Sequence, residues 1–120
     1  MKILVVDDSK AMRMIVQRTL RQAGYGDAAM TEAANGKEAL DVLRRESFDV
    51  VLSDWNMPEM SGIQLLEAVR AEKIAVRFGF VTSEGTTPMR EQAAAAGALF
   101  LVAKPFTVES FQDAMKTALG

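Results

Sequence analysis

Five short apolar runs alternate with segments of helical periodicity, and this alternation limits the possible folds more than any other feature. The runs cover residues 2–6, 28–33, 49–53, 75–82 and 98–102, of which 28–33 lacks a strong β signature. Continuous apolar runs of this length are typical of strands buried on both faces. Strands and helices that alternate through short loops favour a parallel sheet covered by helices on both sides. The sequence therefore predicts an α/β fold of five parallel strands and five helices, with residues 1–120 as a single domain.

Start and stop signals bound the helices between these runs. The first helix is predicted over 10–23, the fourth ends at about 96, and the last covers 107–119. The predicted N-terminal caps are Ser9, Asn35, Ser61 and Thr87, the last of which precedes Pro88. Ser61 and Gln64 have the spacing of a capping box. We expect the fourth helix to be loosely anchored, because 93–96 is a run of alanines and Gly79 thins a strand expected beneath it.

The composition excludes several classes of function. The chain has no cysteine and no histidine, which rules out disulfides, Cys/His metal sites and a histidine general base. A formal net charge of −2 gives no electrostatic signature for nucleic acid or an anionic membrane. No apolar run approaches the roughly 20 residues of a membrane span, and no signal peptide is evident, so we expect a cytoplasmic protein.

Charged and hydroxyl side chains follow four of the five predicted strands. They are Asp7 and Asp8, Asp54, Thr82 and Ser83, and Lys104. All strands of a parallel sheet end at the same edge, where open α/β sheets bind ligands, so we expect these side chains to converge. The strand at 28–33 ends in nothing comparable.

Three neighbouring carboxylates repel one another and raise each other's pKa unless a cation lies among them. With no histidine or cysteine in the chain, a hard divalent ion bound by oxygen atoms, Mg²⁺ or Ca²⁺, suits such a site. Asp54 could act as a nucleophile toward phosphorus, with Thr82 and Lys104 contacting the phosphoryl group. Each residue alone also has a simpler explanation, such as Asp7 and Asp8 capping the first helix. Their convergence at one edge favours the functional interpretation.

Four motifs resemble those of bacterial response-regulator receiver domains, in particular the single-domain chemotaxis type. They are Val5-Val6-Asp7-Asp8-Ser9, Ser53-Asp54-Trp55-Asn56-Met57-Pro58, Phe80-Val81-Thr82-Ser83 and Lys104-Pro105-Phe106. The resemblance extends over essentially the whole chain. It implies a flavodoxin-like fold with strand order 2-1-3-4-5.

The resemblance also implies a role for each site residue. Asp54 would accept a phosphoryl group from a phosphohistidine on a sensor histidine kinase. Mg²⁺ would be bound by Asp8, Asp54 and the Asn56 carbonyl, with help from Asp7. Thr82 and Lys104 would contact the phosphoryl group and signal to the face formed by the fourth helix, last strand and last helix. We expect a monomer that is not an enzyme and that signals by binding a downstream target protein there.

Two positions depart from the family pattern. Receiver domains usually carry an aromatic switch residue three positions before the lysine, and this chain has Leu101 there. Phe100 lies next to it, but neighbouring residues of a strand point to opposite faces. Ser61 stands where the family often has aspartate before Gly62, and because serine caps helices well we expect little effect.

Other functions remain open at this stage. A Mg²⁺-dependent phosphatase with an aspartyl nucleophile typically needs a second acid two residues after the first, and Asn56 stands there. A phosphate sink or relay receiver would use the same residues as a switch. A flavodoxin-like FMN carrier would need a phosphate-binding loop after the first strand, where Asp7 and Asp8 would repel phosphate.

Overall fold

A central parallel sheet organises the molecule. The computed structural model describes residues 1–120. Its strands are β1 (Lys2–Val6), β2 (Ala29–Ala33), β3 (Val50–Ser53), β4 (Arg77–Thr82) and β5 (Phe100–Ala103). All neighbouring strands pair in parallel, in the order β2-β1-β3-β4-β5. The predicted α/β fold and strand order are therefore confirmed.

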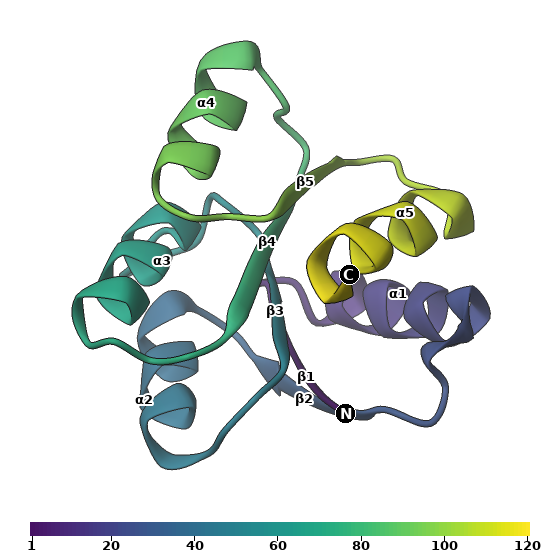
Figure 1. Ribbon diagram of the computed structural model, residues 1–120, viewed down its shortest axis with the longest axis horizontal. Helices are drawn as coiled ribbons and strands as arrows, with labels where there is room; N and C mark the ends of the chain where they lie inside the picture. The colour runs from purple at the N-terminus through teal and green to yellow at the C-terminus, as the bar shows by residue number, and fades with distance from the viewer.

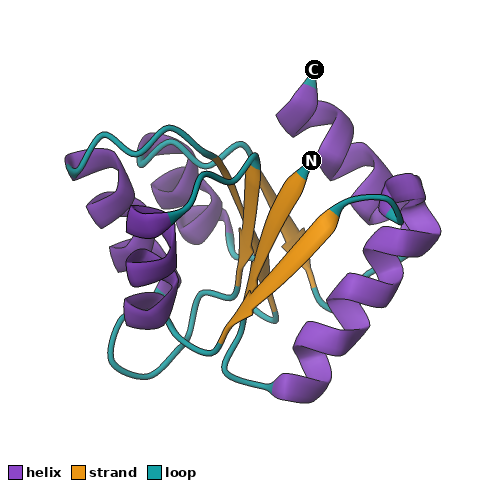
Figure 2. Ribbon diagram, turned by 90° about the horizontal axis from the view of Figure 1, so that it is seen from below, coloured by secondary structure: helices purple, strands orange, loops and turns teal.

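Helices cover both faces of this sheet. They are α1 (Lys10–Leu20), α2 (Gly36–Arg45), α3 (Gly62–Ala71), α4 (Thr87–Ala95) and α5 (Val108–Leu119). Figure 1 shows α2, α3 and α4 on one side of the sheet and α1 and α5 on the other. Figure 2, seen from below, shows the strands enclosed between these two helical layers. No helix is long and apolar enough to cross a membrane.

Two hydrophobic clusters fill the spaces between the sheet and the helices. Alternate strand residues face opposite layers, so Leu4, Val51 and Phe80 belong to the cluster under α2, α3 and α4. Val5 and Leu52 belong to the cluster under α1 and α5. Because β1 and β3 are buried on both faces, the residues that follow these strands start from a tightly packed support.

Helix caps agree with the predictions at three of the four N-termini. Ser9 and Asn35 accept hydrogen bonds from the first turns of α1 and α2, and Ser61 forms the predicted capping box with Gln64. The prediction of Thr87 as the cap of α4 was wrong by one residue. The Thr86 hydroxyl accepts the hydrogen bond from the Met89 backbone, and Thr87 is already helical.

The end of the first helix also differs from its predicted bounds. Regular α-helix stops at Leu20, and a wider turn (Arg21–Tyr25) continues the chain. Gly24 lies within that turn at φ 110°, a backbone conformation that favours glycine. Ile15 is exposed although it is apolar, because the buried face of α1 centres on Val16 and Leu20.

The predictions for the last strand and for Gly79 needed correction. The strand starts at Phe100 instead of residue 98, because the backbone of Ala98 closes the end of α4 by donating to the Ala93 carbonyl. Gly79 pairs with Phe100 in the sheet, and the Phe100 ring fills the space where a side chain on Gly79 would lie. Phe100 packs against the cluster under α1 and α5, so Gly79 does not thin the sheet beneath α4.

The loose anchoring of α4 has a different origin. Ala93 is the only buried residue of this helix, whereas α3 buries five. Because burial of apolar surface is the main force that holds a helix to a sheet, α4 is the most weakly attached of the five helices.

We expect Gly79→Ala to lower the free energy of unfolding by about 1–3 kcal/mol, because the new methyl group would overlap the Phe100 ring. The combined variant with Phe100→Leu should recover part of this loss. Gly26→Ala is the matched control, since nothing lies within 4 Å of its added methyl group. Urea unfolding measures all of these values, and equal effects at the two glycines would contradict the assignment of Phe100 as the filler.

Candidate functional site

The acidic residues predicted to converge do so at the carboxyl edge of the sheet. Asp7 and Asp8 directly follow β1, and Asp54 directly follows β3. One carboxylate oxygen from each of the three lies within 4.8 Å of the others. The acids are close because β1 and β3 are adjacent strands whose last residues, Val6 and Ser53, pair with each other.

Asp7 is buried and its carboxylate is fully engaged. One oxygen accepts a hydrogen bond from the Ser9 backbone (2.9 Å), and the other accepts one from Lys104 Nζ (3.2 Å). Its backbone N–H donates to the Ala33 carbonyl at the end of β2 (3.2 Å). These contacts fix Asp7 as the inner member of the acidic cluster.

Asp54 combines burial with access from outside. Its Oδ1 accepts a hydrogen bond from the Trp55 backbone (2.8 Å), its Oδ2 lies 3.7 Å from Lys104 Nζ, and 13% of its side chain is exposed. Burial raises the pKa of the Asp54 carboxyl above its ordinary value, and the charges of Asp7 and Asp8 add to this rise while Lys104 opposes it. Asp54 is therefore a carboxylate that a ligand can reach and whose ionised form is disfavoured by burial.

Lys104 and Thr82 reach the same edge from β5 and β4. The Lys104 ammonium, 16% exposed, contacts Asp7 and Asp54 and provides one positive charge against three negative ones. Thr82 is fully buried, and its hydroxyl oxygen accepts a hydrogen bond from the Glu84 backbone (3.2 Å). The Lys104 backbone N–H donates to the Thr82 carbonyl (2.8 Å), so the ends of these two strands are tied together.

The loop after β3 brings Asn56 to the edge of the site. Asn56 is exposed and lies two residues after Asp54. The loop turns back because the Gly62 N–H donates to the Trp55 carbonyl (2.8 Å). A side chain at Gly62 would overlap the Asp54 carbonyl and the Phe80 ring, so this close approach requires glycine. The sequence alone does not predict this supporting role of Gly62.

The structure also connects β2 to the site, which the sequence did not suggest. Glu32 near the end of β2 forms an ion pair with Arg13 of α1 (2.8 Å), and Arg13 Nη1 donates to the Asp7 carbonyl (2.7 Å). Nothing in the sequence around Arg13 indicates a partner for its side chain. Only the position of α1 across the ends of β1 and β2 reveals the connection.

Leu101 and Phe100 lie on opposite faces of the sheet, as strand geometry predicted. Leu101 packs against the cluster under α4, and Phe100 against the cluster under α5. Leu101 therefore occupies the face expected for the switch residue of the family, and the neighbouring ring does not replace it.

The donor atoms at this edge suit a hard divalent cation. Three carboxylates supply oxygen, and neither histidine nor cysteine occurs in the chain. Close carboxylates with one lysine leave an excess of negative charge that a divalent ion would neutralise. The acidic cluster can therefore hold a metal ion.

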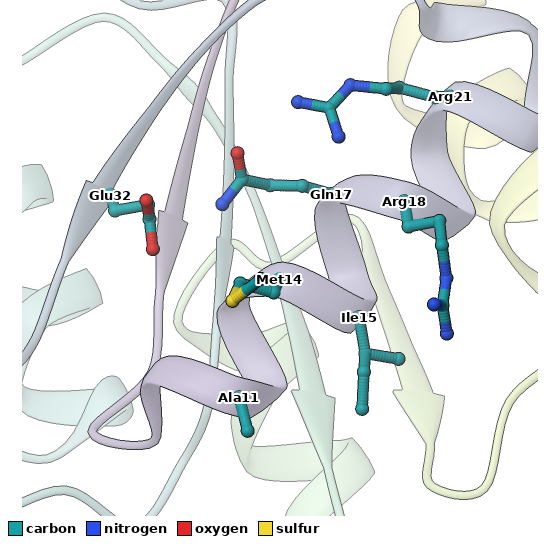
Figure 3. Close-up of a pocket in the computed structure, with 7 residues that line it drawn as sticks. All are labelled: Ala11, Met14, Ile15, Gln17, Arg18, Arg21 and Glu32. Carbon is teal, nitrogen blue, oxygen red and sulfur yellow. The ribbon is translucent and has the colours of Figure 1, made fainter.

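The most voluminous pocket lies elsewhere, along the outer surface of α1 (Figure 3). Its lining contains none of the residues of the acidic cluster, and consists of Ala11, Met14, Ile15, Gln17, Arg18, Arg21 and Glu32. In Figure 3 Glu32 faces Gln17 across the gap between β2 and α1. The volume of a pocket therefore does not identify the acidic site, which consists of charged groups at the carboxyl edge of the sheet.

Comparison with known proteins agrees with the fold and the site. Residues 3–116 match the response regulator receiver domain family. A chemotaxis protein CheY homolog from Campylobacter jejuni is 42% identical over 123 residues, covering 100% of this chain and 93% of that protein. The chemotaxis protein CheY of Pseudomonas aeruginosa is 42% identical over 115 residues, covering 94% of this chain and 91% of that protein.

A solved structure shows the same architecture. The chemotaxis protein CheY4 of Vibrio cholerae superimposes with a TM-score of 0.85 at 34% identity, covering 98% of this chain and 97% of that one. The chain therefore belongs to the response regulator receiver domain family. This confirms the resemblance inferred from the four motifs and the predicted function in phosphorylation-controlled two-component signalling.

The raised pKa of Asp54 generates a prediction for stability. A carboxyl whose pKa is higher in the folded state destabilises the fold once it ionises, so the penalty is present at neutral pH and absent below about pH 4. We expect Asp54→Asn to raise the free energy of unfolding at pH 7 without divalent ions, and to lose this advantage near pH 3. Urea unfolding at both pH values measures the difference.

Asp113→Asn, at an exposed position of α5, is the matched control and should change little at either pH. If Asp54→Asn raised the free energy of unfolding equally at both pH values, ionisation of Asp54 could not be the cause of the difference.

Proposed function

We propose that Asp54 accepts a phosphoryl group from a phosphohistidine and that residues 1–120 act as one receiver domain. The observation that carries this proposal is the position of Asp54, the partly exposed member of an acidic cluster that also contacts Lys104. In the transfer, an Asp54 carboxylate oxygen bonds to phosphorus while the bond between phosphorus and the donor's imidazole nitrogen breaks. The imidazole leaves with the electron pair of that bond.

The remaining site residues assist by charge and hydrogen bonding. Asp7, Asp8, Asp54 and the Asn56 carbonyl would hold Mg²⁺, which supplies positive charge that offsets the negative charge on the phosphoryl oxygens. Lys104 is already beside Asp54 and neutralises part of the charge that the new acyl phosphate adds. Thr82 donates its hydroxyl proton to a phosphoryl oxygen, which requires the hydroxyl to move toward Asp54.

The relatives suggest the biological setting. Because similar proteins are named for chemotaxis, we propose that this chain receives its phosphoryl group from a sensor histidine kinase in a chemotaxis or motility system. The phosphorylated form would bind a target protein on the face formed by α4, β5 and α5, as a monomer that performs no further catalysis. A phosphatase function is less well supported, because Asn56 lacks the acid that such enzymes use to activate water. A cytoplasmic location stays a prediction.

The acceptor can be tested by labelling. With acetyl phosphate and Mg²⁺, wild-type protein should form one acyl phosphate, which reduction with borohydride converts to a stable product that maps to Asp54. Asp54→Asn should lose the label, and Asp113→Asn should keep it. Undiminished label in Asp54→Asn would show that another residue accepts the phosphoryl group.

The switch can be tested by hydrogen exchange. Movement of Thr82 should shift the loop over 83–86, which Arg90 connects to β5 by donating to the carbonyls of Gly85 (3.2 Å) and Leu101 (3.3 Å). With Mg²⁺, we expect the phosphoryl mimic beryllofluoride to change hydrogen exchange most across residues 83–97, because α4 is weakly anchored. The mimic can shift the equilibrium between the inactive and active conformations only if it binds one of them more tightly than the other.

Thr82→Ala should abolish this change, whereas Thr82→Ser, which retains a hydroxyl, should keep most of it. Leu101→Ala should also keep most of it. A response lost in Leu101→Ala and retained in Thr82→Ala would instead make the leucine the switch.

A further inference from the structure

Arg13 joins three segments of the protein beside the acidic cluster. It is carried by α1, its side chain is only 14% exposed, and its guanidinium makes two short contacts. Nη1 donates to the Asp7 carbonyl (2.7 Å), and Nε contacts Glu32 Oε1 of β2 (2.8 Å). The planar, forked guanidinium can bond both groups at once in a fixed geometry, so this side chain acts as a rigid bridge.

The peptide groups around Asp7 are held from two directions. Glu32 and Ala33 stand opposite Val5 and Val6 in the register of β1 and β2. The Ala33 carbonyl accepts the Asp7 N–H, and Arg13 binds the Asp7 carbonyl. That carbonyl belongs to the peptide bond between Asp7 and Asp8. The bridge therefore fixes the orientation of the bond that joins two members of the acidic cluster.

Asp8 is positioned only through its backbone: Arg13 holds the peptide before it, and the peptide after it donates the Ser9 N–H to the Asp7 carboxylate. Its side chain is exposed and makes no hydrogen bond or ion pair with the rest of the protein. Asp7, in contrast, is held through both carboxylate oxygens. The direction in which Asp8 offers its carboxylate is therefore set by the backbone, and the part of the backbone that Arg13 holds is the peptide just before it.

The charge of the bridge is balanced locally. Glu32 is 41% exposed, and its hydrogen bond to Arg13 lowers the pKa of its carboxyl. At neutral pH the Glu32 carboxylate and the Arg13 guanidinium are therefore both charged. An unpaired guanidinium this close to Asp7 would repel a cation bound among the carboxylates. Glu32 cancels that repulsion while it holds the guanidinium in place.

We propose that Arg13 and Glu32 form a positioning pair that orients the Asp7–Asp8 peptide for divalent-cation binding without adding net positive charge to the site. The inference rests on the proposed function, in which Asp7 and Asp8 bind Mg²⁺. It assigns a part in the site to β2, through residues that do not touch the cation themselves. Residues that orient metal ligands in this way typically change metal affinity by 10–100-fold when mutated.

The test measures Mg²⁺ affinity in the full chain and, separately, stability without metal. Trp55 is the only tryptophan and its backbone N–H binds the Asp54 carboxylate, so its fluorescence can report cation binding, with titration calorimetry as an independent measurement. Arg13→Ala should weaken Mg²⁺ binding about tenfold. Arg13→Lys should lose less, since an ammonium retains the charge and can reach one of the two partners. Arg18→Ala, an exposed arginine on the same helix, is the matched control and should bind as wild type.

A double-mutant cycle separates positioning from simple charge. Glu32→Gln alone should weaken Mg²⁺ binding several-fold, but in the Arg13→Ala background it should have no further effect, because its only connection to the site is gone. A loss from Glu32→Gln of equal size in both backgrounds would overturn the proposal, since it would show a long-range charge effect. So would an affinity for Arg13→Ala within twofold of wild type.

The melting temperature in EDTA distinguishes positioning from folding. A reduced Mg²⁺ affinity in Arg13→Lys or Glu32→Gln with an unchanged melting temperature supports the proposal, even if Arg13→Ala fails to fold. If wild-type protein neither binds Mg²⁺ nor takes up phosphoryl groups, the proposed function itself fails. If wild type does both and the variants match it, only the positioning pair is refuted.

Discussion

Electrostatic repulsion among Asp7, Asp8 and Asp54 is the constraint around which the structure is built. Oxygens from the three carboxylates lie within 4.8 Å, and like charges at such a separation repel one another, most strongly where burial reduces screening by water. Chains relax such repulsion when they are free to move. Here the acids follow β1 and β3, whose side chains are buried on both faces, so relaxation would disturb the packed core. The fold therefore imposes a concentration of negative charge, and both Lys104 and a divalent cation are favoured by it.

The same sheet carries helices that are buried to different extents: α2 and α3 each bury five residues, whereas α4 buries one. The acidic residues that could hold a cation directly follow the inner strands β1 and β3, where Arg13 and the close approach of Gly62 fix the backbone. Thr82 ends β4 and Lys104 directly follows β5, and between these strands lies α4, a helix whose only buried residue is Ala93. A charge placed on Asp54 acts on both sets of residues, but only the second can respond at low cost. Under the proposed function, this difference would let one site combine a fixed binding geometry with an output that can move.

Much of this arrangement could be predicted from sequence because it follows from local patterns. Apolar runs located the strands, and the rule that parallel strands end at one edge brought Asp7, Asp54 and Lys104 together. The errors came from contacts between distant segments. The ring of Phe100 over Gly79 depends on the register of β4 and β5, and the bridge from Glu32 to Arg13 depends on where α1 crosses the sheet. No spacing within either segment carries that information, so pattern reasoning assigned Gly79 to the wrong face and gave β2 no part in the site.

The position of the aromatic ring also bears on how the output responds. In this chain the ring of Phe100 is packed on the α5 side of the sheet, over Gly79, while Leu101 packs on the α4 side without a ring. A ring on that face of the sheet cannot fill space that Thr82 would vacate on the α4 side. The loop after Thr82 is restrained by two hydrogen bonds from the exposed guanidinium of Arg90 and by the hydrogen bond from the Glu84 N–H to the Thr82 hydroxyl, each worth about 0.5–1.5 kcal/mol. A new hydrogen bond to a charged phosphoryl group contributes about 1.5–3 kcal/mol, which is enough to compete with that restraint. The loop and α4 can therefore be moved by Thr82 without an aromatic residue to stabilise the new position.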